Sequence, residues 1–535
     1  MGGRGMSKYV YGIDLGTTYS CIAYQDETGR PVVVQNREGT NTTPSVVQFA
    51  EETNEVIVGQ IAKDTSVMYA KNTISMIKTK MGRESTIVYG NNDEYEISPV
   101  EVSACILKKM CRDAGELLDD EVKDVVITCP AYFGDTERMA TKQAGIIAGL
   151  HVVSILDEPT AAAIYYGVSR ESEEKTVLVY DLGGGTFDVT VMHVNGGDIN
   201  VICTQGNHDL GGKDWDAAVM RYVANEFEEM TGFSGEYDDE ARQDLAIKVE
   251  RAKIQLSMRE KTTIMLHVDG YKAGIELTRE CFDEITKPLL DTTIELTKKV
   301  IDEARSYGVD FIEELLLVGG STKMPQVMEK VLDEFAMEPK ILEPDEAVAK
   351  GAAIFAIVNL MERQKELESM ELIEEELDRL PSNSLEPIYA GAVTIHTKTT
   401  KSFGIKALRG DRLVISNVIL KNEDTPCTVS KLFGIAEDNQ EVADIEVYES
   451  TILDKTYEVD EAFKIGNAVL KLPPGLKTGS GVEITLHLSN EGMISLTGKE
   501  MTSGNEVIAS FQSECILEEE EVLEKKRKMN HLLIE

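Results

Sequence analysis

Short apolar runs alternate with longer amphipathic stretches from residue 8 to about residue 360. The runs at 125–129, 176–182 and 314–320 are rich in Val, Ile and Leu, which is typical of strands buried on both faces of a sheet. The segment 98–118 instead spaces its apolar residues as an amphipathic helix does. The alternation predicts an α/β layered fold for this part of the chain.

The pattern changes after residue 360. Residues 361–380 carry eight acidic and three basic side chains, which favours a solvated helix, and Pro381 and Pro387 then indicate a loop. From residue 392 to 514 the apolar period becomes two, so an all-β sandwich is predicted. The expected divisions are an α/β domain at 8–360, a charged helix and linker at 361–391, a β-sandwich at 392–514 and a short helical tail at 515–535.

Composition narrows the classes of function. A formal net charge of −40 argues against non-specific binding to nucleic acid or to an anionic membrane. The eight cysteines are scattered and form no Cys-x-x-Cys pair, so they are expected to be reduced core thiols. The sequence contains neither a signal-peptide pattern nor an apolar run long enough to span a membrane, and a cytoplasmic protein is expected.

One internal repeat carries the candidate chemistry. Residues 9–24 and 178–194 share a plan in which a buried strand runs into Asp-Leu-Gly, then into Gly or Thr residues, then into a second strand. The two aspartates, Asp14 and Asp181, are 167 positions apart. Two copies of one unit at this separation predict a duplicated fold with two lobes.

These loops fit a nucleoside triphosphate and its metal. Glycines let backbone N–H groups approach a phosphate, and two carboxylates can hold the hydration shell of Mg²⁺. A third loop at 315–325 has a strand, a Gly-Gly-Ser turn and a helix, although such joints are common structural turns. A pair of tight hairpins with Asp-capped turns is the structural alternative. No P-loop motif is present.

The three loops in this order resemble the superfamily of actin, sugar kinases and heat-shock ATPases. The segment 126–167 closely resembles the connecting segment of the 70-kDa heat-shock chaperones, whose bacterial type is DnaK. The motifs YGIDLGTTYSCIA, DLGGGTFDVT, VERAKIQLS and LVGGSTKMPQV resemble the same family. The resemblance covers nearly all of residues 8–358 and implies an actin-like, two-lobed ATPase domain.

The resemblance also implies the residues of a nucleotide site that takes ATP or ADP with Mg²⁺, and K⁺ as a further candidate cation. The implied metal site uses Asp14, Asp181 and Glu158 through water. The implied catalytic residues are Lys78, Asp181, Thr186, Glu158 and Asp188. The implied nucleotide-binding residues are Gly16, Thr17, Thr18, Tyr19, Gly183, Gly184, Gly185, Gly212, Glu250, Lys253, Ser257, Gly319, Gly320, Ser321, Met324 and Asp345.

Some of these assignments have plain structural alternatives. Lys78 on spacing alone is an ordinary helix-surface lysine, and Glu250, Lys253 and Ser257 form a helical stripe with an ion pair. Only the family match favours their functional roles. Because positioning and charge neutralisation carry most phosphoryl-transfer catalysis, a slow, gated ATPase is expected.

The β domain resembles the family's peptide-binding sandwich more weakly. An extended polypeptide could be held there by backbone hydrogen bonds and an apolar pocket. Ala443 stands where the family has a larger aliphatic residue, which predicts an altered pocket. Each residue could equally be plain sandwich core. The candidate pocket residues are Phe403, Ile405, Leu408, Phe433, Ala436, Ala443 and Ile445.

The sequence differs from the family's pattern in three places. The family's leucine-rich interdomain linker is reduced to residues 392–400, with Thr397 at its acidic position. Ser154 and Asp157 replace the Arg and Asn that meet a J-domain co-chaperone, so a standard J-domain partner is not expected. The chain ends at Glu535, where the family's long helical lid would begin, and faster peptide release is expected.

The leading hypothesis is therefore a divergent, lidless 70-kDa heat-shock chaperone that hydrolyses ATP to control its affinity for unfolded or extended polypeptide. A nucleotide exchange factor is a candidate partner. The first alternative is a nucleotide-gated scaffold with weak turnover and a dedicated partner. The second is an actin-like filament or a small-molecule kinase, which the β domain and the connecting segment disfavour.

Overall fold

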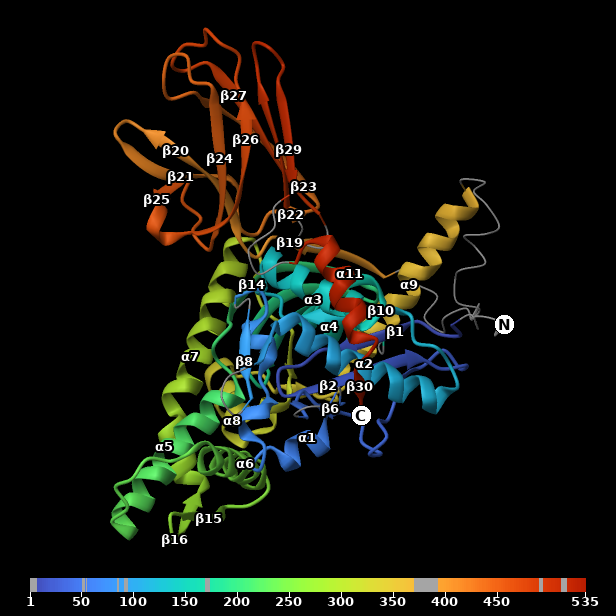
Figure 1. The fold of residues 1–535 in the computed structure, drawn as a ribbon, viewed down its shortest axis with the longest axis vertical. Helices are drawn as coiled ribbons and strands as arrows, with labels where there is room; N and C mark the ends of the chain where they lie inside the picture. Colours follow the sequence, from blue (N-terminus) through green and yellow to red (C-terminus); the bar gives the residue numbers. More distant parts are fainter. Residues whose placement is uncertain are drawn as a thin grey trace.

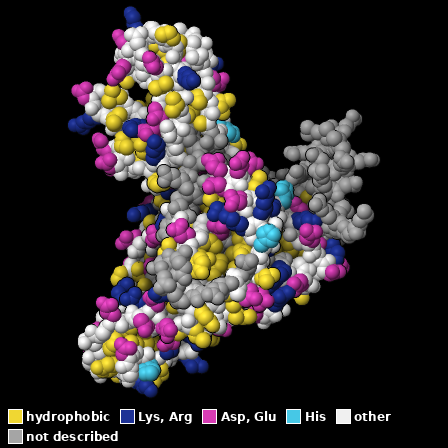
Figure 2. Space-filling model, in the orientation of Figure 1, with side chains coloured by type: hydrophobic (Ala, Val, Ile, Leu, Met, Phe, Trp, Pro, Cys, Tyr) yellow, Lys and Arg dark blue, Asp and Glu magenta, His cyan; other side chains and the backbone are white. Residues whose placement is uncertain are grey.

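The computed structural model describes residues 7–50, 53, 55–83, 86–90, 95–168, 174–369, 393–489, 494–510 and 517–535. The chain forms an α/β domain of two lobes, from which a β-sandwich domain projects (Figure 1 and Figure 2). No helix within these described residues is long and apolar enough to cross a membrane.

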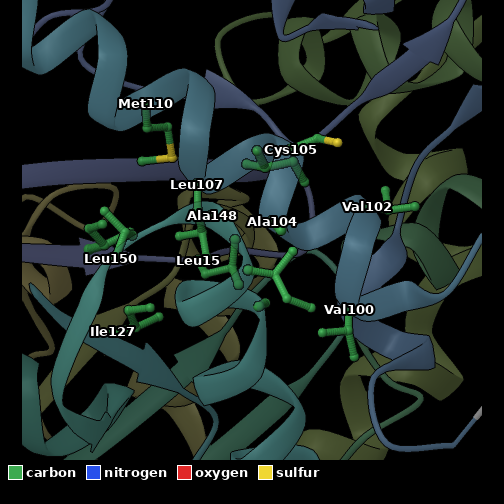
Figure 3. Packing of buried hydrophobic residues seen from close by; sticks show 14 of the residues in the cluster. Leu15, Val100, Val102, Ala104, Cys105, Leu107, Met110, Ile127, Ala148 and Leu150 are labelled. Carbon is green, nitrogen blue, oxygen red and sulfur yellow. The ribbon is translucent and has the colours of Figure 1, made fainter. Parts of the chain in front are cut away.

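The first lobe is built on a mixed sheet with the order β11-β10-β1-β2-β3. β1 pairs in parallel with β10 and antiparallel with β2, so it is central and buried. Helices α2 and α3 pack on this sheet, and Figure 3 shows side chains from both helices meeting the sheet in one apolar core. The bounds are β1 Tyr11–Asp14, β2 Tyr19–Gln25, β3 Pro31–Val33, β4 Thr43–Pro44, β10 Asp124–Cys129, β11 His151–Asp157, α2 Pro99–Leu118 and α3 Asp135–Ala148.

Local signals in the sequence set the ends of these helices. The Ser98 hydroxyl accepts the Glu101 N–H, and the Glu101 carboxylate accepts the Ser98 N–H, so a capping box begins α2. Gly149 ends α3 at φ 98°, a left-handed conformation that glycine adopts without steric cost.

The first lobe also contains a smaller sheet and several short elements. Their bounds are β5 Val47–Phe49, β6 Glu55–Val58, α1 Gln60–Thr65, β7 Thr73–Ile74, β8 Ile87–Tyr89 and β9 Tyr95–Ile97.

The second lobe repeats the central unit of the first. β12 pairs antiparallel with β13 and in parallel with β17, as β1 does with β2 and β10. This correspondence confirms the predicted two-lobed, actin-like α/β domain. The bounds are β12 Lys175–Leu182, β13 Phe187–Asn195, β14 Asp198–Asn207, α5 Gly212–Thr231, α6 Asp239–Leu256, β15 Lys261–Val268, β16 Tyr271–Thr278, α7 Arg279–Ser306, β17 Glu314–Val318, α8 Pro325–Phe335 and β18 Lys340–Ile341.

Two helices join the lobes. α4 (Glu158–Val168) and α9 (Ala347–Ser369) share one apolar cluster with strands of both sheets. Their backbones approach closely because Gly351 has no side chain, and a Cβ there would lie 1.8 Å from the Ala161 carbonyl oxygen. The beginning of the expected charged helix, at 361–369, continues α9. The rest of that prediction, at 370–391, lies outside the described residues.

The first strand after that gap belongs to the α/β domain. β19 (Thr394–Lys398) pairs in parallel with β14 and extends the second lobe's sheet. β22 (Asp424–Thr425) of the sandwich domain then pairs with the outer edge of β19. The structure therefore differs from the predicted start of the sandwich at residue 392, because the free edge of β14 recruits this strand.

The remaining strands form two antiparallel sheets that enclose one apolar core, which confirms the predicted all-β domain. The chain then returns to the first lobe through α11 (Glu519–Met529) and β30 (Leu533–Ile534). The predicted short helix is thus present, followed by a strand. The sandwich bounds are β20 Ser402–Arg409, β21 Arg412–Ile419, β23 Cys427–Gly434, β24 Val442–Ser450, β25 Thr456–Glu458, β26 Phe463–Lys471, β27 Gly481–Leu488, β28 Ile494–Glu500 and β29 Glu506–Ser510.

Candidate nucleotide site

A cavity of about 550 Å³ opens between the two lobes. Every proposed nucleotide, metal or catalytic residue lines it, with the exceptions of Gly185 and Asp188. Much of the lining comes from the loops after β1, β12 and β17 and from one face of α6, and Lys78, Glu158 and Asp216 add to it from other elements. Residues that are hundreds of positions apart in the sequence therefore surround one space of the size that small-molecule sites have.

The two Asp-Leu-Gly loops touch one another across this cavity. A Cβ at Gly184 would lie 2.3 Å from the Thr18 hydroxyl oxygen, and one at Gly185 would lie 2.7 Å from the Thr17 methyl carbon. Glycine is thus required in the second loop because the first loop occupies the side-chain space. The same lack of side chains exposes backbone N–H groups toward the cavity, which is the chemistry that binds phosphate.

Acidic side chains with one lysine line the phosphate end. Lys78 forms a buried ion pair with Glu158. Burial alone would lower the pKa of Lys78, but the Glu158 and Asp14 carboxylates outweigh it and raise that pKa. Burial and the Glu158 charge raise the pKa of Asp14 to about 7, and the same two causes raise the pKa of Asp181 well above its usual value. Lys78 therefore does not balance the negative charge of the Asp14, Asp181 and Glu158 carboxylates.

That deficit fits a hard divalent cation. Carboxylate oxygens are the ligands that Mg²⁺ accepts, and Mg²⁺ commonly keeps several of its waters. Among the described residues, no three Asp, Glu, His or Cys side chains converge closely enough to ligate an ion directly. The donor set is thus consistent with a hydrated Mg²⁺ held by Asp14, Asp181 and Glu158 through water.

Asp188 lies behind the cavity. Its carboxylate faces Asp181 across the β12–β13 pair and accepts the Tyr132 backbone N–H at 3.2 Å. Burial and the Glu158 charge raise the pKa of Asp188 well above its usual value. This position suits a residue that acts through a neighbour better than one that touches the nucleotide directly.

At the opposite end of the cavity, the loop after β17 contacts the second Asp-Leu-Gly loop, and α6 contacts the start of α5. The Ser321 hydroxyl donates to the Gly183 carbonyl at 2.8 Å, and the Lys253 ammonium donates to the Gly212 carbonyl at 3.0 Å. Lys253 also pairs with Asp216 at 2.7 Å. These contacts join the second Asp-Leu-Gly loop to the proposed nucleoside-binding residues.

Lys63, which was not predicted from the sequence, contacts two residues that line the cavity. Lys63 of α1 lies 2.7 Å from Glu250 of α6 and donates to the Tyr19 hydroxyl at 2.9 Å. Asp216 was missed as well. The two partners of the Lys63 ion pair are 187 positions apart, so no local spacing could have indicated it.

The candidate peptide residues divide into three groups. Phe403, Ile405 and Ile445 are buried in the sandwich core, and Phe433 and Ala443 pack against that core while half-buried. Leu408 has 54% of its surface exposed, and Ala436 is exposed. The structure brings the first five together and leaves the last two at the surface.

The sandwich docks against the α/β domain beside the connecting segment. The Arg138 guanidinium is buried, pairs with Asp157 at 2.6 Å and donates to the carbonyls of Ala131 and Phe133. The loop that these bonds fix carries Tyr132, whose ring lies under the Lys401 ammonium at 4.5 Å. A cavity of about 300 Å³ remains at this junction and includes Ser154 and Asp157.

Comparisons with known proteins agree with this architecture. The chain matches the Hsp70 protein family over residues 10–374. It is 36% identical over 522 residues to the chaperone protein DnaK of Thermosipho melanesiensis, covering 96% of this chain and 82% of that protein. It is 35% identical over 523 residues to the chaperone protein DnaK of Thermotoga maritima, with the same coverage. The chain belongs to the Hsp70 family of ATP-dependent chaperones.

Proposed function

We propose that this protein binds ATP with Mg²⁺ in the cleft between its lobes and hydrolyses it slowly to ADP and phosphate. The nucleotide state then sets the affinity of the sandwich domain for extended polypeptide in the cytoplasm. The observation that carries the proposal is the pairing of the two Asp-Leu-Gly loops across one cavity, with Lys78 at its acidic end.

Each residue has a defined task in the proposed reaction. Lys78 steadies the γ-phosphate and the attacking water, while Asp14, Asp181 and Glu158 would hold the hydration shell of Mg²⁺. Bound there, the metal would supply charge neutralisation on the phosphate oxygens. Thr186 orients the water, and Asp188 positions the loop behind it. Water adds to the γ-phosphorus as the bond to the ADP oxygen breaks.

A continuous set of contacts supports coupling between the cleft and the sandwich. Asp188 accepts the Tyr132 N–H, and the Tyr132 ring lies under Lys401 at the start of the sandwich domain. β19 adds to the edge of β14, whose neighbour β13 carries Asp188. A shift of Asp188 that accompanies hydrolysis would therefore act on both attachments of the sandwich.

Extended polypeptide is the proposed substrate because an antiparallel sandwich offers strand edges and apolar side chains for such a segment. The relatives' name, chaperone protein DnaK, agrees with this class of substrate. A nucleotide exchange factor and K⁺ are further proposed ligands of the ATPase domain. A standard J-domain partner is not proposed because Asp157 is held in the ion pair with Arg138.

The rate at which a fluorescent, extended apolar peptide leaves the protein tests this proposal. Release is measured after mixing with excess unlabelled peptide, in ADP and in ATP. The proposal predicts release at different rates in the two nucleotides. Equal rates, with ATP hydrolysis intact, would exclude coupling and favour the nucleotide-gated scaffold.

A further inference from the structure

The segment 517–535 returns from the sandwich domain to the first lobe. In Figure 1, α11 (red) runs beside α3 and α2, and the chain ends close to β6, far from the sandwich strands that precede it. Its apolar side chains Val522, Met529 and Ile534 are 6%, 2% and 5% exposed and join the core of the first lobe. The segment is therefore part of the ATPase domain's core, although it follows the sandwich in sequence.

Specific polar contacts fix the register of this docking. Gln143 of α3 donates to the Leu517 carbonyl at 2.6 Å and accepts the Leu517 N–H at 3.1 Å. Lys525 pairs with Glu101 of α2 at 2.7 Å, and Lys108 donates to the Met529 carbonyl at 2.6 Å. Both ends of α11 are thus held by side chains of the first lobe.

The last residues complete a sheet. β30 pairs in parallel with β6, so that Ile534 lies opposite Val56. The Val58 N–H donates to the Glu535 carbonyl at 2.8 Å, and the Glu535 N–H donates to the Val56 carbonyl at 2.8 Å. The segment thereby satisfies backbone groups on an edge that would otherwise be open to pairing with another strand.

This docking limits where the sandwich domain can go. Ser510 at the end of β29 and Leu517 are seven positions apart, which a chain spans with at most about 25 Å. The sandwich is also attached through β19 on the edge of β14. While both attachments hold, the sandwich cannot move far from the first lobe.

We propose that residues 517–535 form an intramolecular strap that fastens the sandwich domain to the first lobe, with the β6 edge as its receptor. The strap raises the effective concentration of the sandwich domain at its docking surface on the first lobe, as a second tether does for a ligand that binds at two sites. Docking therefore persists in the absence of nucleotide. Release of the strap frees the sandwich and opens the β6 edge to a strand.

Hydrogen exchange on the full chain without nucleotide tests the strap. Two amides report on its two effects: the Val58 N–H, which donates to the strap's Glu535 carbonyl, and the Thr394 N–H, which donates to the Gly197 carbonyl at the other attachment. The variants are Ile534→Asp, whose side chain is 5% exposed, and its neighbour Leu533→Asp, which is 62% exposed and serves as the matched control.

If residues 517–535 act as a strap, the Val58 amide should lose its protection in Ile534→Asp. The Thr394 amide should exchange faster by at least about a hundredfold, which is the lower end of the gain from a second tether. Leu533→Asp should change neither. If Ile534→Asp does not fold, Lys525→Glu replaces it, with the exposed Lys528→Glu as its control. Two results would overturn the proposal. One is unchanged exchange at Thr394 in a folded variant that has lost protection at Val58. The other is unchanged exchange at Thr394 in both Ile534→Asp and Lys525→Glu when both are folded.

Discussion

The Lys63 ammonium of the first lobe lies 2.7 Å from the carboxylate of Glu250, a residue of the second lobe that lines the cavity between the lobes. The side chains are only 18% and 20% exposed, so water screens the pair less than it screens a surface ion pair. Because the pair joins the two lobes beside the cavity, we expect it to slow the lobe separation that lets a bound nucleotide leave.

Lys63→Met should therefore speed ADP release by about three- to tenfold, which corresponds to roughly 1 kcal/mol of lost closure. A fluorescent ADP analogue, displaced by excess ATP in a stopped-flow instrument, measures the rate. Lys248→Met, which removes a lysine paired with Asp244 within α6 itself, is the control and should release ADP at the parent rate. Parent-like release from Lys63→Met would show that the pair does not gate the cleft.

The docking of the sandwich should depend on pH through two carboxylic acids at the domain junction. Burial and the Glu449 charge raise the pKa of Asp135 to about 8, and burial and the Glu137 charge raise the pKa of Glu449 to about 7. Lys401 and Arg138 nearby favour the charged forms without overcoming these effects. The Glu449 carboxylate lies so close to the backbone that a Cβ at Gly134 would be 2.9 Å from its Oε2.

Because both pKa values are raised in the docked state, docking takes up protons. The contribution of these two groups to docking is fully present below about pH 4 and is lost as pH rises to about 8. Glu449→Gln should keep the domains docked at pH 8 and flatten this dependence, while the exposed Glu461→Gln should not. Fluorescence transfer between labels on the two domains at pH 6, 7 and 8 measures docking. A stronger pH dependence in Glu449→Gln would contradict the assignment.

The buried carboxylates at the acidic end of the cleft lower the stability of the metal-free protein and are the proposed ligands of the metal. Asp14 is buried, and the Glu158 charge adds to the cost of ionising it. Asp14→Asn should therefore raise the melting temperature in the absence of divalent cations by about 2–4 °C, the shift expected for roughly 1 kcal/mol. The same variant should lose Mg²⁺-dependent ATP hydrolysis. Differential scanning calorimetry in EDTA checks the first effect, and a lower melting temperature would argue against the charge deficit.

Ile405 and Leu408 of β20 allow the contribution of core packing and the contribution of peptide contact to be tested separately. Ile405 is 2% exposed and Leu408 is 54% exposed on β20. Ile405→Ala should destabilise the sandwich by about 2–5 kcal/mol, as cavity formation in a core does. Leu408→Asp should leave the melting temperature nearly unchanged and weaken binding of an apolar peptide. Fluorescence anisotropy measures the binding, and full peptide affinity in Leu408→Asp would exclude this residue from the site.

The sequence predicted the parts of the fold that repeat a local pattern. The loops that begin at Asp14 and Asp181 could be recognised because each follows a buried strand, and the strand after Asp181 pairs as its counterpart does. The separate β domain was predictable because its apolar residues recur with a period of two. Burial along β20 does not alternate, however, so the exposure of Leu408 beside the buried Phe403 and Ile405 could not be predicted from that period.

The remaining features depend on long-range contacts that leave no local signal. The pairing of Lys63 with Glu250 requires the closed arrangement of two lobes. β30 has two residues, too few to show any periodicity, and forms only because the edge of β6 is there to pair with it. β19 likewise takes its place from β14 and not from its own composition.

The central claim is that the two loops and Lys78 form an ATP-hydrolysing site, and single-turnover hydrolysis tests it most directly. ATP at a concentration below that of the protein is mixed with Mg²⁺, and ADP formation is followed for the parent, Lys78→Met and the surface control Lys248→Met. Lys78→Met should still bind ATP but hydrolyse it at least about 100-fold more slowly, while the control should match the parent. Hydrolysis by Lys78→Met at the parent rate would exclude Lys78 from the reaction.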